Sequence, residues 1–95
     1  MNSAIVDADS LHRATTLLGE ASSDSKHVAA ELNLARDAIE TAGEASSARA
    51  VAWQLDDAIH HLRSAEALSE TDTVLVPVRN ARQLVAAARG GGLCV

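Results

Sequence analysis

A short pattern of apolar residues is repeated four times along the chain. In each copy of the pattern, apolar residues follow the first one at offsets of three, seven and ten positions. A large aliphatic residue alternates with alanine in every copy. Steps of three and four residues return to the same side of a helix, so this spacing predicts the a/d seam of a packed helix. Alanine at d lets helix axes approach closely, which favours antiparallel neighbours in a bundle. The four copies are Leu11-Ala14-Leu18-Ala21, Leu32-Ala35-Ile39-Ala42, Leu55-Ala58-Leu62-Ala65 and Val78-Ala81-Val85-Ala88.

The intervals between copies predict where the chain turns. The first two copies lie 21 residues apart, which is three whole heptads, so residues 9–43 form either one long helix or two helices separated near Gly19 and residues 22–25. The later copies lie 23 residues apart, and the register slips by two positions each time. These slips predict turns at residues 43–47 and 69–77.

Two all-α architectures satisfy these turns. One is a closed antiparallel bundle of four helices. The other is a hairpin of two long arms, residues 4–43 and 47–89, which would need a dimer partner because two helices bury little surface. Pro77 suits the first turn of the last helical segment in the bundle, and in the hairpin it would kink the second arm. Three glycines then end the helix, so residues 1–89 form one helical domain and residues 90–95 a flexible Gly-rich tail.

Composition and charge narrow the function. The chain has 95 residues, 20 of them alanine, and Trp53 is the sole aromatic residue. A net charge of −5 with scattered arginines provides no basic stripe, so we expect no nucleic-acid ligand. No apolar run is long enough for a membrane span and no signal peptide is evident, so we expect a soluble cytoplasmic protein, with export that needs no cleaved signal left open. Nothing indicates a cofactor.

Cys94 is the single cysteine, so no disulfide framework or thiolate-rich metal site is predicted. A thiol on a glycine-tethered tail could pair between chains or be modified, or it could have no function. No basic residue is adjacent in sequence to activate it.

Carboxylate and histidine side chains stand three residues apart at three places. Such pairs ligate metals in helical bundles when both side chains project inward. The heptad register instead places these histidines at positions b, c and f, away from the seam, and predicts no metal site. The pairs are Asp9-His12, Asp24-His27 and Asp57-His60.

The segment from His60 to Ser64, His-His-Leu-Arg-Ser, resembles the phosphohistidine motif of histidine-phosphotransfer domains. Those domains are four-helix bundles that carry the histidine on an outward helix face. The resemblance implies that His60 accepts a phosphoryl group, with Arg63 and Ser64 one turn away to support it. Ser64 replaces the usual glycine, and Asp57 would repel a phosphate.

The register also defines an outer stripe on the third helical segment, made of Arg49, Trp53, Asp57 and His60. An exposed Trp beside charged residues is typical of a binding hot spot. The alternative is that the apolar segments 4–6 and 74–76 cover Trp53. The stripe leads us to expect a non-catalytic interaction module, binding a protein partner or a second copy, with phosphotransfer through His60 as the alternative.

Length, the central turn and the lack of a signal peptide are similar to the WXG-type small helical hairpins of type VII secretion. Those proteins pair as dimers of antiparallel hairpins, so the resemblance implies a partner-binding role. The Trp-x-Gly turn is missing, because Trp53 is followed by Gln54 and Leu55 inside a helical segment. The Tyr-containing export signal is missing too, since the chain has no Tyr.

Overall fold

The computed structural model describes residues 8–21 and 26–93, which form four helices and no strand. The predicted all-α antiparallel bundle of four helical segments is therefore confirmed. The helices are α1 (Ala8–Glu20), α2 (Lys26–Glu44), α3 (Ala48–Leu68) and α4 (Asp72–Leu93).

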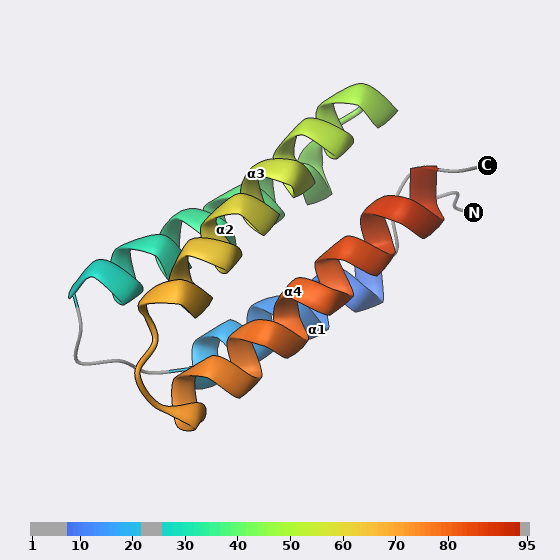
Figure 1. The fold of residues 1–95 in the computed structure, drawn as a ribbon. Coiled ribbons are helices and arrows are strands. Elements are labelled where there is room, and N and C mark those ends of the chain that lie inside the picture. Colours follow the sequence, from blue (N-terminus) through green and yellow to red (C-terminus); the bar gives the residue numbers. More distant parts are fainter. Residues whose placement is uncertain (1–7, 22–25, 94–95) are drawn as a thin grey trace.

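The described helices lie around one common core in an up-down-up-down arrangement (Figure 1). Each helix packs against the next along the chain, and α4 returns to pack against α1. In the described part of the chain, no Cα atom of α1 comes within 8 Å of one of α3, and the same holds for α2 and α4. The molecule is elongated, with principal extents of 40 × 17 × 17 Å.

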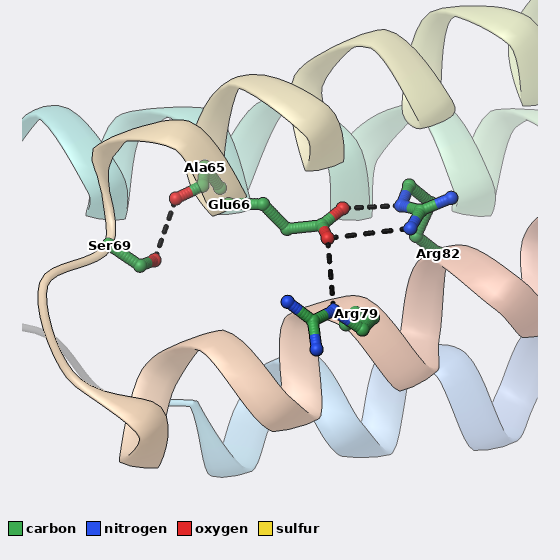
Figure 2. A network of polar contacts seen from close by, with 5 residues as sticks. All are labelled: Ala65, Glu66, Ser69, Arg79 and Arg82. Carbon is green, nitrogen blue, oxygen red and sulfur yellow. Dashed lines mark hydrogen bonds and ion pairs between the residues drawn. The ribbon is translucent and has the colours of Figure 1, made fainter.

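Local hydrogen bonds explain how α3 begins and ends. Ser47 is its N-cap: the hydroxyl accepts the N–H of Ala50 at 3.1 Å, which satisfies a backbone donor that the helix leaves free. At the other end the Ser69 hydroxyl donates to the Ala65 carbonyl at 2.6 Å, as Figure 2 shows. The chain turns within the predicted range 43–47, at residues 45–47, between the end of α2 at Glu44 and the start of α3 at Ala48.

Every heptad residue predicted from the repeat is buried in this core. Three valines that the repeat did not include are buried with them, at Val28, Val51 and Val74. Each lies four residues before the first member of its copy, which is the preceding d position of the same seam. Alanine is therefore not used at every d position, because valine occupies d near the start of three helices.

The hairpin of two long arms is not the observed architecture. Glu20 ends α1 and Lys26 begins α2, so residues 9–43 form two helices. Likewise α3 and α4 are separate helices, which excludes a single arm over residues 47–89. Since all four helices belong to one chain, their apolar sides cover one another without a dimer partner.

Two details of the last helix differ from the predictions. The sequence predicts Pro77 in the first turn, but α4 begins at Asp72, so the proline lies in the second turn. The helix starts early because the carbonyl of Thr71 already accepts the N–H of Leu75 at 2.9 Å. The glycine run was expected to end the helix, yet α4 continues through it to Leu93. Cys94 and the segment 4–6 lie outside the described residues.

No helix in the described part of the chain is long and apolar enough to cross a membrane.

Candidate interaction surface on helix α3

The outward side of α3 carries the most exposed large apolar side chain among the described residues. Leu55, Ala58 and Leu62 fix the inward side of this helix and are fully buried. Trp53 lies on the opposite side and is 73% exposed. No described residue covers most of the indole, and Val74 of the proposed covering segment is buried in the core instead. The core is therefore completed without the only aromatic side chain of the protein.

Two shallow hollows flank the Trp53 side chain. The larger, of about 440 Å³, is lined by Arg49, Trp53, Asp56 and Asp57. The smaller, of about 330 Å³, lies towards the start of the helix, where Ser47, Ala50 and Gln54 join Arg49 and Trp53. The structure thus brings three of the four predicted stripe residues together around the hollows, whereas His60 does not line either.

The charged groups at this surface differ in how far they are neutralised. The Arg89 guanidinium of α4 binds Asp56 through two contacts, with Nε at 2.5 Å from Oδ1 and an Nη at 3.2 Å from Oδ2. Asp57 has a longer contact, 3.5 Å from Oδ1 to Nε2 of His61. Arg49 forms no ion pair with any described residue. Its charge also lies in the first turn of α3, where the helix dipole disfavours a cation.

The two adjacent histidines have different environments. His61 is largely buried between helices, and its Nδ1 lies 3.1 Å from the Glu31 carboxylate of α2. His60 is exposed and forms no hydrogen bond or ion pair within the described residues; it contacts the His61 ring edge-on at 5.4 Å between centroids. Leu62 belongs to the core, while Arg63 is exposed and Ser64 half-buried.

The histidines of the three Asp-x-x-His pairs lie on three different helices. The carboxylate of Asp57 contacts His61 rather than His60. His12 and His27 are exposed on α1 and α2, and Asp24 lies outside the described residues. No group of three His, Cys, Asp or Glu residues in the described ranges is placed to hold a metal ion.

The register did not point to Asp56 or Arg89 as members of this surface. Helical spacing could have identified Asp56, because it lies three residues after Trp53, at the b position beside the stripe. The role of Arg89 did not, because it is 33 residues away and reaches Asp56 only through the packing of α4 on α3.

A second polar cluster joins α3 to α4 near the turn between them. Glu66 receives the Arg82 guanidinium on both carboxylate oxygens, and Arg79 Nε lies 3.6 Å from one of these oxygens (Figure 2). The Glu66 side chain is largely buried. Because the Glu66 carboxylate is paired with arginines of the neighbouring helix, we assign the cluster to the stability of the bundle rather than to ligand binding.

Comparisons with protein-family models, with curated proteins and with solved structures find no significant match to this chain. The assignment of a function to the α3 surface therefore depends on its own geometry and chemistry.

Proposed function

We propose that the protein is a non-catalytic interaction module that binds a protein, either a partner or a second copy, through the outer face of α3. The observation that carries this proposal is the exposure of Trp53, at 73%. Leaving an indole in water forgoes the apolar burial that a core position would provide. Trp is also among the residues that contribute most to binding energy at protein interfaces.

The surroundings of Trp53 support the same proposal. Hollows on both sides of the indole give a partner side chain room to pack against its edges. Arginine is a residue type that is enriched in protein interfaces. Arg49 lies in the first turn of α3, where a positive charge does not stabilise the helix. A binding role accounts for both residues.

The experiment that tests this proposal is site-specific photocrosslinking in the source cells. A photoreactive amino acid replaces Ala50, which lines the smaller hollow, and in a control replaces Ala67, an exposed alanine further along α3. We expect a discrete adduct from position 50, none from position 67, and loss of the adduct when Trp53→Ala is added. Equal adducts from both positions, or an adduct that persists in Trp53→Ala, would contradict the proposal.

A second candidate function is histidine phosphotransfer through His60. The observation that favours it is the exposed imidazole of His60 on a four-helix bundle, which forms no hydrogen bond to the described residues. Leu62, two positions further on, is buried in the core. This arrangement resembles that of histidine-phosphotransfer domains. The carboxylate of Asp57, one turn before His60, opposes it by repelling a phosphoryl group.

Incubation with a phosphorylated response regulator tests this candidate. Transfer predicts acid-labile phosphate on the wild-type protein and on His61→Gln, but not on His60→Gln. An unlabelled wild-type protein, or label that remains in His60→Gln, would rule out His60 as the acceptor.

The cytoplasm is the place of action in this proposal. A partner-binding role is also what the resemblance to WXG-type proteins implies, and that resemblance is the reason to measure the protein in culture medium as well as in cells.

A further inference from the structure

We infer that the partner is a second copy of this chain, docked so that the two α3 helices run antiparallel about a two-fold axis at Trp53. This inference depends on the proposed function, because it requires that the outer face of α3 binds protein. It adds the identity of the partner and the register of the contact.

The charges on the stripe are arranged symmetrically about Trp53. Arg49 lies four residues before it and Asp57 four residues after it, so all three point to the same side of the helix. In an antiparallel pair with a two-fold axis at Trp53, each position before this residue faces the position equally far after it in the other copy. Arg49 of each copy then faces Asp57 of the other, and two ion pairs form from one kind of contact.

The remaining charge on the face does not interfere with this register. The same axis places Asp56 of one copy opposite Ala50 of the other, and Asp56 is already neutralised by Arg89. Arg49 has no ion-pair partner within the described residues. Asp57 is about half exposed and has a contact of 3.5 Å on one oxygen only, which leaves acceptor capacity for a guanidinium. The face is therefore complementary to itself.

The two indoles meet at the centre of this contact. Paired aromatic rings prefer offset or edge-on packing, and the hollows beside each Trp53 leave space for such an offset. The contact uses one face of a helix of 21 residues, which is smaller than a standard interface. We therefore expect a weak dimer with a dissociation constant on the order of 10 μM.

A charge-swap experiment tests the register directly. In Arg49→Asp each copy presents aspartate at both positions, and in Asp57→Arg each presents arginine at both, so either variant alone repels itself. A one-to-one mixture of these two variants restores both ion pairs. Analytical ultracentrifugation should show dimerisation of the wild type, at least about tenfold weaker dimerisation of each variant alone, and recovery in the mixture.

Fluorescence of the single Trp supplies an independent readout. Emission of the wild type should move to the blue and resist iodide quenching as the protein concentration rises, because the indole becomes buried. The same change should appear in the mixture of variants and not in either variant alone. Circular dichroism of each variant confirms that the exposed substitution leaves the helices intact.

The outcomes separate this inference from the proposed function. A wild type that stays monomeric at about 100 μM, or a dimer that both variants form as well as the wild type, overturns the inference. If the Ala50 crosslink then yields a Trp53-dependent adduct with a different protein, the proposed function stands alone. If no such adduct forms, both fail.

Discussion

Trp53 and Leu55 lie two positions apart on α3 and have opposite environments. The indole is exposed, whereas the Leu55 side chain is fully buried among the other helices. We expect Trp53→Ala to cost less than about 1 kcal/mol of unfolding free energy, because few contacts of the folded chain are lost. Leu55→Ala should cost about 2–5 kcal/mol, because it leaves a cavity in the core.

Urea unfolding followed by circular dichroism measures both values, since the first variant has no Trp signal. Dilute protein is used so that self-association does not contribute. A cost for Trp53→Ala as large as that for Leu55→Ala would show that the indole belongs to the fold, and the binding proposal would lose its main support.

At the scale of the helices, Glu66 and Asp56 of α3 both pair with arginines of α4, and the two carboxylates differ in burial. The Glu66 side chain is 15% exposed, whereas that of Asp56 is 57% exposed. Removing Glu66 leaves Arg82 partly desolvated and unpaired, so Glu66→Ala should cost about 1–2 kcal/mol. Asp56→Ala serves as the matched control and should cost less than about 1 kcal/mol, because water screens an exposed pair.

Denaturant titrations of the two variants in low and high salt make this comparison. The Asp56 contribution should vanish in high salt, while most of the Glu66 contribution remains. Equal costs for both variants would mean that burial does not distinguish the two pairs.

At the scale of the whole molecule, small core residues set the distance between helices. Ala58 is fully buried at a d position, and the bundle is only 17 Å across in two directions. Ala58→Leu should therefore cost about 1–3 kcal/mol, because the added atoms force the helices apart or distort side chains.

Ala67→Leu adds the same atoms to an exposed position of the same helix and should change stability by less than about 0.5 kcal/mol. Thermal unfolding of the two variants beside the wild type gives the comparison. A neutral Ala58→Leu would contradict the close packing that the alanine seam implies.

The sequence by itself determined which side of each helix faces the core. Leu11, Ile39 and Leu62 follow one heptad spacing, and this local periodicity gathers apolar side chains on one side of a helix, whichever helix then covers it. The same spacing placed Trp53 on the outward side. It also located the turn before Ser47, because the register slips there.

Tertiary structure decided what periodicity leaves open. The first two copies of the repeat lie a whole number of heptads apart, and a loop between two helices can preserve that distance. The repeat therefore could not show whether residues 9–43 form one helix or two. Gly43 marked the predicted turn, yet it lies inside α2, and Ser47 supplies the cap. The pairing of Arg89 with Asp56 depends on how far α4 is shifted along its axis relative to α3, and the sequence pattern of either helix does not specify this shift.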